Sequence, residues 1–404
     1  MRLHKNLVLA VVRTLNQIFN DQVYADKAVE KILKSNPRWG SRDRGFIAET
    51  VYDIVRWKRL YMEIASVSEP FQKEAMLRLF AVWATLKGIS LPPWDEFRLV
   101  PTRRIKGRFD ELSKIRKFRE SIPDWLDEMG SDALGEPLWS EELKALNQVA
   151  PVVLRTNTLK TTREDLKKVL AEEGIQTFIL KDYPEALVLE QRSNVFRTKA
   201  FSSGLFEVQD ASSQKVALFL EPKPGMRVID ACAGAGGKTL HLACLMENKG
   251  QIIALDIYHQ KLKELKRRSR RNGAHNIETR LIESNKVIKK LHGKADRVLI
   301  DAPCSGTGVL RRNPDAKWKL SNEFVLALLD QQAEIFHRYA KMVKPGGKLV
   351  YATCSILPQE NEVQVERFLK SDAGQDFELE KDLHLWASKT GYDGFYMARL
   401  HKRN

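Results

Sequence analysis

The strongest constraint on the fold is an alternation of short apolar runs with longer helical segments, which begins after residue 225. Five runs rich in Val, Ile and Leu are predicted to form strands, and they cover residues 227–231, 252–256, 278–282, 297–301 and 348–353. Segments of ten or more residues with helical character separate them, and such alternation is typical of a parallel sheet with helices on both faces. We therefore predict a doubly wound, mainly parallel α/β sheet, with residues 377–379 and 394–400 as antiparallel edge strands.

The residues before this sheet follow different patterns. Residues 7–65 carry apolar side chains at spacings of three and four, which indicates the buried faces of helices. Residues 152–155, 177–180 and 186–189 are predicted strands, and with a helix over residues 162–173 they make a small α+β unit. The predicted domains are a helical domain (1–95), a basic linker and helix (96–121), a small α+β subdomain (122–205) and the α/β domain (206–404).

The charge balance limits the class of partner. The 404 residues include 67 Lys and Arg against 52 Asp and Glu, a formal net charge of +15. This excess favours a polyanionic partner, because Lys and Arg neutralise phosphates. No run approaches the roughly 18 apolar residues of a membrane span, and the first apolar run is too short for a signal peptide, so we predict a cytoplasmic protein without a membrane partner. Four cysteines without a Cys-x-x-Cys pair support neither a disulfide scaffold nor a metal site.

Two basic runs are candidates for contact with the phosphates. In the first, residues 103–119, Phe109 and Phe118 are interleaved with Lys and Arg, a mixture that suits a nucleic-acid strand because aromatic rings stack on bases. An exposed amphipathic helix explains the same pattern equally well. The second run, residues 261–268, lies on the predicted helix after Asp256, and we interpret it as a solvated face.

A glycine-rich loop at residues 230–239 directly follows the first predicted strand of the α/β domain. A phosphate-binding P-loop would need glycine at Cys232, and a dinucleotide fingerprint would need glycine at Thr239, so the sequence weakens both hypotheses. The third hypothesis is S-adenosylmethionine, because Asp256 ends the second strand, where an acidic side chain can accept the ribose hydroxyls. A tight strand-to-helix turn without a ligand is the alternative.

Two cysteines follow predicted strands of the same sheet. Cys304 follows the fourth strand, next to the Asp301-Ala302-Pro303 turn, and Cys354 follows the fifth. The carboxyl ends of parallel strands meet at one edge of a sheet, so both thiols should face the crevice of the glycine loop.

Two thiols beside a methyl donor suit methylation of carbon 5 of a pyrimidine. That carbon is a weak nucleophile until a thiolate adds to carbon 6 and creates an enamine. Asp301 is a candidate for holding a proton near cytosine N3 while the adduct forms. The remaining cysteines, Cys232 and Cys244, are interpreted as structural.

These motifs in combination resemble a known family. The Asp301–Ser305 and Ala352–Ser355 motifs and the 232–238 loop are similar to those of the Sun/Fmu/NOP family of S-adenosylmethionine-dependent RNA cytosine-C5 methyltransferases. The likeness covers roughly residues 122–400, and residues 1–90 look similar to the helical NusB-like extension of bacterial rRNA members. It implies a Rossmann-like class I methyltransferase domain, preceded by a small α+β RNA-binding subdomain.

The resemblance also implies roles for single residues. It makes Cys354 the nucleophile and Cys304 a participant in product release. The implied cofactor contacts are Cys232, Ala233, Gly234, Ala235, Gly236, Gly237, Lys238, Asp256, Asp301 and, in place of the family's usual Asp, Glu283. The predicted RNA contacts are Lys238, Arg103, Arg104, Arg108, Arg116, Lys117 and Arg311. The family loop usually has Pro where Ala235 stands.

The sequence therefore predicts a monomeric enzyme that methylates cytosine in RNA, with rRNA favoured over tRNA as the substrate. Two hypotheses of other classes remain. A catalytically silent RNA-binding or ribosome assembly factor would not need the two thiols, Asp301 or Lys238. An NAD-dependent dehydrogenase is disfavoured by Thr239 and gives no reason for paired thiols.

Overall fold

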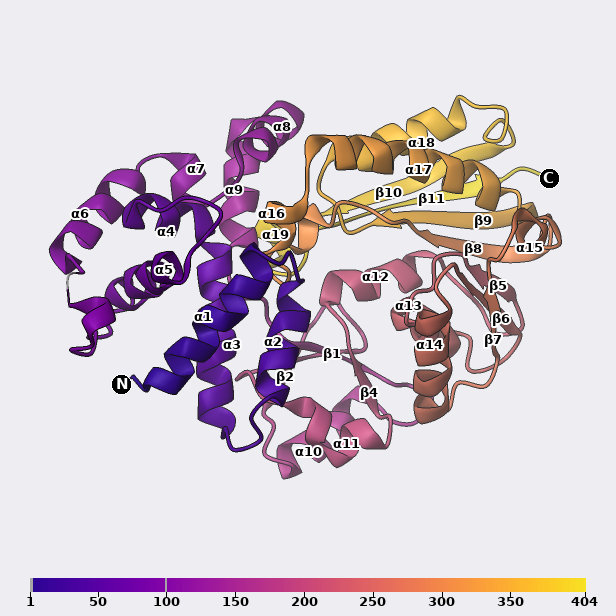
Figure 1. Cartoon of the computed structure of the whole chain (residues 1–404). Helices are drawn as coiled ribbons and strands as arrows, with labels where there is room; N and C mark the ends of the chain where they lie inside the picture. Colours follow the sequence, from indigo (N-terminus) through magenta and orange to yellow (C-terminus); the bar gives the residue numbers. More distant parts are fainter. Residues whose placement is uncertain (1–2, 99) are drawn as a thin grey trace. The chain divides into compact units, whose positions relative to one another are not determined.

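The computed structural model describes residues 3–98 and 100–404. The chain forms two compact units, each drawn in Figure 1. Unit 1 comprises residues 1–148 together with 310–322, and unit 2 comprises residues 149–309 and 323–404. Within the described ranges, no helix is long and apolar enough to cross a membrane.

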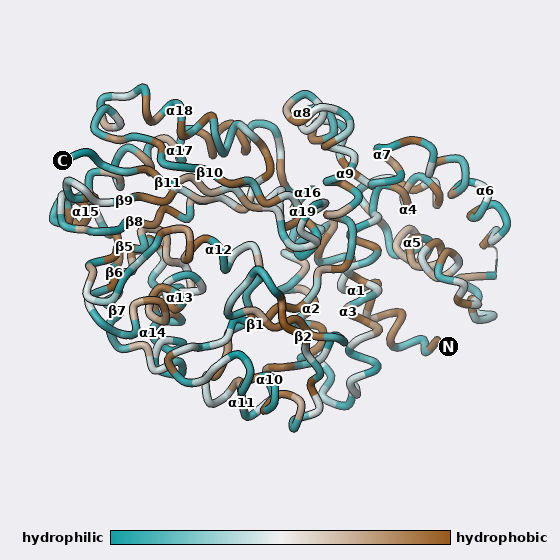
Figure 2. The backbone as a smooth tube through the Cα atoms, turned by 180° about the vertical axis from the view of Figure 1, so that it is seen from behind, coloured by the Kyte–Doolittle hydropathy of each residue, from teal (hydrophilic) through white to brown (hydrophobic). Residues whose placement is uncertain are grey.

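Unit 1 is helical, as the spacing of its apolar residues predicts. Its helices include α1 (Lys5–Phe19), α2 (Ala25–Lys34), α3 (Ser41–Arg56), α4 (Lys58–Ala65), α5 (Lys73–Leu86), α6 (Thr102–Leu112), α7 (Arg116–Arg119), α8 (Asp124–Leu134), α9 (Glu136–Leu146) and α16 (Ala316–Lys319). Leu15, Ile54 and Phe80 are fully buried where their apolar faces meet. Helix α6 carries the basic run on its outside and buries only Ile105, and its tube in Figure 2 is mostly hydrophilic.

Residues 310–322 belong to unit 1 although they are distant from it in the sequence. The Asp315 carboxylate accepts a hydrogen bond from the Ala25 N–H (2.9 Å), and the Trp318 indole N–H donates to the Val55 carbonyl (2.7 Å). The first contact satisfies the N–H of Ala25 at the start of α2, and the second satisfies the carbonyl of Val55 in α3. The segment 310–322 is therefore part of the helical core of unit 1. No periodicity in the sequence predicts this insertion.

Unit 2 contains a small antiparallel sheet, which confirms the predicted α+β part. The strands are β1 (Val153–Thr156), β2 (Thr177–Ile179), β3 (Ala186–Leu189) and β4 (Phe206–Val208), in the order β2-β3-β1-β4. Helices α10 (Arg163–Glu172) and α11 (Lys199–Ser202) pack on it through an apolar cluster that includes Leu166 and Phe206. Strand β4 is not among the strands that the sequence predicts.

The larger sheet of unit 2 has the predicted doubly wound architecture. It consists of β5 (Arg227–Asp230), β6 (Gln251–Asp256), β7 (Ile277–Leu281), β8 (Ala295–Asp301), β9 (Val343–Thr353), β10 (Phe377–Leu385) and β11 (Phe395–Lys402), in the order β10-β11-β9-β8-β5-β6-β7. Strands β5 to β9 pair in parallel, and β10 and β11 add the predicted antiparallel edge.

Helices cover both faces of this sheet, as Figure 1 shows. Helices α12 (Ala211–Phe219), α13 (Gly237–Leu245) and α14 (His259–Asn272) lie on one face, and α15 (Asn285–Lys289), α17 (Asn322–Ala340) and α18 (Glu362–Leu369) on the other. The strand order changes direction at β5, which has β6 on one side and β8 on the other. Ligands bind in such sheets at the carboxyl ends of the strands beside this switch point.

A close helix contact in unit 1 gives a test of its packing. A Cβ at Gly130 in α8 would lie 2.4 Å from Cε2 of Trp139, whose ring is buried and whose N–H donates to Asp127. We expect Gly130→Ala to lower the free energy of unfolding by about 1–3 kcal/mol through overpacking.

The matched control is Gly107→Ala in α6. No described atom lies within 4 Å of the Cβ position there, so the variant should gain about 1 kcal/mol from helix propensity. Urea unfolding of both variants measures the difference, and equal stabilities would contradict the packing.

Candidate active site

Parallel pairing of β8 with β9 brings the two strand-end cysteines together. Asp301, the last residue of β8, is the register partner of Ala352 in β9, so the chain leaves both strands at the same level of the sheet. Cys304 and Cys354 follow within three residues, and their sulfur atoms lie 3.4 Å apart. Both side chains are half-buried, so part of each cysteine remains exposed.

Glu360 ties the two cysteine loops to each other. Its fully buried carboxylate accepts hydrogen bonds from the Ser305 N–H (2.8 Å) on one oxygen and from the Ser305 and Ser355 hydroxyls (2.5 Å each) on the other. Gln332 of α17 donates to the first oxygen (3.0 Å). Ser305 follows Cys304 and Ser355 follows Cys354, so one carboxylate fixes the residue beside each thiol.

Sequence analysis did not identify Glu360 as a site residue. A partial signal is its position, because Glu360 lies five residues after Ser355, the last residue of a motif that carries the family resemblance. The spacing between Cys354 and Glu360 in the sequence gives no indication that the Glu360 carboxylate bonds residues of both cysteine loops. The next residue acts on the same loop, since Asn361 accepts from the Thr353 hydroxyl (2.5 Å) and donates to the Ser355 carbonyl (3.0 Å).

The electrostatic environment distinguishes Cys304. Its hydrogen bond with Cys354 and its burial, together with the charges of Cys354 and Glu360, raise the pKa of the Cys304 thiol well above its ordinary value. Cys304 therefore stays protonated at neutral pH and can donate its proton in a hydrogen bond to the Cys354 sulfur.

Lys238 and Asp301 form an ion pair at the same edge of the sheet. The ammonium of Lys238, in the first turn of α13, lies 2.7 Å from the Asp301 carboxylate and 5.3 Å from the centre of the Phe395 ring. Burial alone would lower the pKa of Lys238, but Asp301, and to a smaller extent Cys354, raise it above its ordinary value. Lys238 is thus charged, and it lies close enough to Cys354 for the two groups to interact electrostatically.

The glycine loop has a backbone that requires glycine. Gly234 and Gly236 adopt positive φ angles of 55° and 87°, and a Cβ at Gly236 would lie 2.6 Å from Cγ of Leu265. Asp256 accepts hydrogen bonds from the Gly234 N–H (2.8 Å) and the Tyr258 N–H (2.7 Å). One carboxylate therefore fixes both the glycine loop and the turn after β6.

These residues fit S-adenosylmethionine. No described atom lies within 4 Å of a Cβ position at Gly234 or Gly237, so there is space beside the loop. Each oxygen of Asp256 keeps a lone pair for a ribose hydroxyl after accepting one backbone N–H. Glu283 is exposed in the turn after β7, where the Ile282 N–H donates to the Asp256 carbonyl (2.9 Å), and this places Glu283 near the same strand end.

Burial raises the pKa of two residues of the glycine loop, Asp230 and Cys232. Asp230 is buried and accepts from the Thr239 hydroxyl (2.7 Å), and burial raises its pKa to about 7. Burial also raises the pKa of Cys232 well above its ordinary value, which keeps that thiol protonated. Cys244 is buried in α13, 3.3 Å from the Asn157 side-chain oxygen.

The predicted RNA contacts are spread over both units. In unit 1, Arg103 and Arg104 are exposed on α6. Three others make ion pairs within that unit: Arg108 with Glu63, Arg116 with Asp127, and Lys117 with Asp124. Arg311 is buried and donates to the Ala145 carbonyl (2.7 Å). Lys238, the predicted RNA contact in unit 2, lies at the start of α13 and pairs with Asp301.

Comparisons with known proteins identify the family. A family model described as 16S rRNA methyltransferase RsmB/F matches residues 217–401, which contain the glycine loop and both thiols. A second model, described as the ferredoxin-like domain of RsmF/B-like methyltransferases, matches residues 122–196. The resemblance seen in the sequence motifs is thereby confirmed.

Individual proteins agree with these models. The chain is 36% identical to ribosomal RNA small subunit methyltransferase B of Proteus mirabilis, over 70% of this chain and 66% of that protein. It is 30% identical to the probable ribosomal RNA small subunit methyltransferase B of Synechocystis, over 98% of this chain and 99% of that protein. The crystal structure of a protein called PH0851 superposes with a TM-score of 0.84 at 25% identity, over the whole of both chains. The chain therefore belongs to the RsmB/F family, whose members are S-adenosylmethionine-dependent RNA cytosine-C5 methyltransferases.

Proposed function

We propose that this protein methylates carbon 5 of a cytosine in 16S rRNA, with Cys354 as the nucleophile. The observation that carries the proposal is the pair of sulfur atoms 3.4 Å apart at the strand ends that also hold Asp301 and Lys238. The names of the curated relatives favour small-subunit rRNA over tRNA as the substrate. A cytoplasmic location and a monomeric state remain predictions.

The first step forms a bond between Cys354 and the base. The Cys354 thiolate adds to carbon 6 of the cytosine, and the electron pair of the C5–C6 bond becomes available at carbon 5. The Asp301 carboxylate lies at the same edge and accepts a hydrogen bond from the proton that cytosine N3 takes up from solvent as negative charge develops on the ring. S-adenosylmethionine, held by the glycine loop and Asp256, would supply the methyl group to carbon 5 from its sulfonium and would leave as S-adenosylhomocysteine. The target base must be unpaired or flipped out of its helix for these contacts to form.

Product release uses the second thiol. After a base has removed the proton from carbon 5, the C5–C6 double bond forms again and the Cys354 sulfur leaves carbon 6 as a thiolate. Cys304, protonated and 3.4 Å from that sulfur, donates a hydrogen bond to the leaving thiolate. Its proton also keeps Cys304 from competing as a nucleophile, which gives the two thiols different roles.

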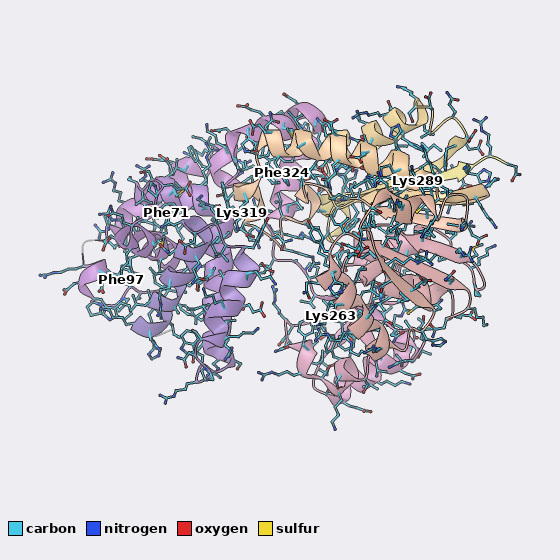
Figure 3. The ribbon with its side chains drawn as sticks, turned by 45° about the vertical axis from the view of Figure 1, so that its right-hand side comes forward. Phe71, Phe97, Lys263, Lys289, Lys319 and Phe324 are labelled. Carbon is cyan, nitrogen blue, oxygen red and sulfur yellow. The ribbon has the colours of Figure 1, made fainter. Side chains whose placement is uncertain are left out.

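Exposed basic side chains supply the proposed RNA contacts. Arg103 and Arg104 on α6 are accessible, and unit 2 exposes Lys263 on α14 and Lys289 on α15 (Figure 3). Arg311 contributes to the packing of unit 1 instead, since its guanidinium donates to a backbone carbonyl inside that unit.

The proposed reaction is tested by bisulfite sequencing of total RNA from a deletion strain and its parent. Bisulfite converts cytosine but not 5-methylcytosine, so we expect one cytosine of 16S rRNA to become convertible in the deletion strain. A newly convertible cytosine in tRNA alone would contradict the rRNA assignment, and an unchanged pattern would contradict the activity.

Substitution of each thiol distinguishes their roles. Cys354→Ala should abolish methyl transfer, because no adduct forms, and should leave S-adenosylmethionine binding within about twofold. Cys304→Ala should accumulate a covalent protein–RNA adduct, visible as a slow band on a denaturing gel, because the leaving sulfur loses its hydrogen-bond donor. Full activity of Cys354→Ala, or the absence of the band with bound 16S rRNA, would refute the respective assignment.

The charge excess predicts a strong salt dependence of RNA binding. Neutralising a few phosphates should weaken binding to 16S rRNA at least about tenfold between 50 and 200 mM salt. The double variant Arg103→Ala, Arg104→Ala should have a shallower slope of log affinity against log salt, whereas Lys370→Ala, an exposed residue next to α18, serves as the control. Filter binding measures both, and identical slopes would exclude α6 from the interface.

A further inference from the structure

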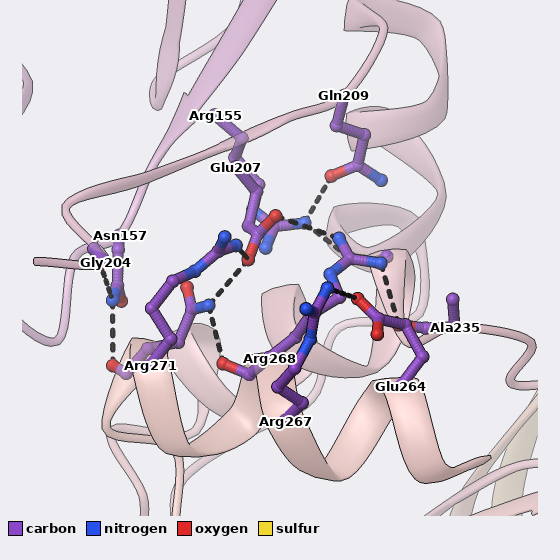
Figure 4. Close-up of polar contacts among 12 residues, drawn as sticks. Arg155, Asn157, Gly204, Glu207, Gln209, Ala235, Glu264, Arg267, Arg268 and Arg271 are labelled. Atoms are coloured by element: carbon purple, nitrogen blue, oxygen red, sulfur yellow. Dashed lines mark hydrogen bonds and ion pairs between the residues drawn. The ribbon is translucent and has the colours of Figure 1, made fainter. Parts of the chain in front are cut away.

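Two arginines bind the carbonyl groups of the glycine loop from outside the crevice. Arg155 donates to the Gly237 carbonyl (2.6 Å), and Arg268 donates to the Ala235 carbonyl (2.7 Å), as Figure 4 shows for Arg268. The loop has glycine at residues 234, 236 and 237 and has few side chains of its own to fix its shape. Hydrogen bonds from charged donors restrict such a backbone more strongly than neutral ones do.

Glu207 holds Arg268 in place. Its carboxylate lies 2.9 Å from a guanidinium nitrogen of Arg268 and pairs with Arg271, and it accepts from the Asn272 amide (2.6 Å) (Figure 4). Burial alone would raise the pKa of Glu207, but Arg268 and Arg271 hold it below its ordinary value, so the carboxylate is ionised.

The arrangement connects the small antiparallel sheet to the loop. Arg155 is on β1 and Glu207 is on β4, and the two residues are register partners across that strand pair. Arg155 is almost fully buried and also donates to the side chain of Gln209, the residue that follows β4 (Figure 4). Strand β1 of the small sheet and helix α14 therefore each contribute an arginine that holds the loop.

We propose that Arg155, bound to Gln209, and Arg268, bound to Glu207, are positioning residues that hold the glycine loop in the shape that binds S-adenosylmethionine. The proposal rests on the proposed role of this loop in cofactor binding. It also assigns the small α+β part a role in the cofactor site, beyond the RNA contact that the sequence predicts for it.

Two neighbouring arginines on α14 provide a matched comparison. Arg268 is mostly buried against Glu207 and the loop, whereas Arg267 is 78% exposed and pairs with Glu264 on its own helix (Figure 4). Arg268→Ala should raise the Kd of S-adenosylmethionine about tenfold, measured by isothermal titration calorimetry on the full chain, and Arg267→Ala should leave it unchanged. At saturating cofactor, kcat of Arg268→Ala should stay within about twofold, because neither thiol contacts the network.

Further outcomes separate the possible failures. Arg268→Lys keeps the charge but has a single donor group, so it should fold and show an intermediate Kd, and it replaces the Ala variant if that variant unfolds. An unchanged Kd in both Arg268 variants, or a loss confined to kcat, would overturn the inference while leaving the proposed function intact. If the unsubstituted protein itself does not bind S-adenosylmethionine, the assignment of the loop fails together with the proposed function.

Discussion

The parallel pairing of β8 and β9 is the constraint on which the active site depends. Asp301 and Ala352 are register partners, so the segments that follow β8 and β9 leave the sheet at the same level. The sulfur atoms of Cys304 and Cys354 in these segments therefore lie 3.4 Å apart. A shift of the register by one residue would reverse which side chains face the crevice, since neighbouring residues of a strand point to opposite faces. The apolar packing on both faces of the sheet therefore stabilises the fold and also fixes the positions of the two thiols.

The reactive groups are held by buried polar groups that lie behind them. Glu360 fixes Ser305 and Ser355 behind the thiols, and Asp256 fixes the glycine loop through the Gly234 N–H. Buried carboxylates are costly unless their oxygens are fully hydrogen-bonded, and here each accepts at least two hydrogen bonds. Fixing the geometry before the substrate arrives lowers the reorganisation that the reaction itself requires.

Local patterns in the sequence predict most strands of the two sheets and the positions of Asp301, Cys304 and Cys354 at the strand ends. The apolar runs of the large sheet, the glycine loop and the two strand-end cysteines each carry their signal within about ten residues, and a parallel sheet brings the strand ends together by its own geometry.

Contacts between distant segments carry no such signal. Residues 310–322 pack in unit 1 through Asp315 and Trp318, and Glu360 turns back beneath two loops. The run 261–268 was interpreted as a solvated face, which holds for Arg267 but not for Arg268, because one step of about 100° along a helix moves a side chain from the solvent to the interior. Such differences depend on which surface the helix meets, and they become visible only in three dimensions.

The central claim is that Cys354 is the residue bonded to the base. The most direct measurement is peptide mapping by mass spectrometry after reaction with S-adenosylmethionine and 16S rRNA that contains 5-fluorocytidine, where fluorine at carbon 5 prevents the final elimination. The account predicts that the peptide containing Cys354 carries the nucleotide and that the peptide containing Cys304 is unmodified. A nucleotide bound to Cys304, or to neither cysteine, would contradict it.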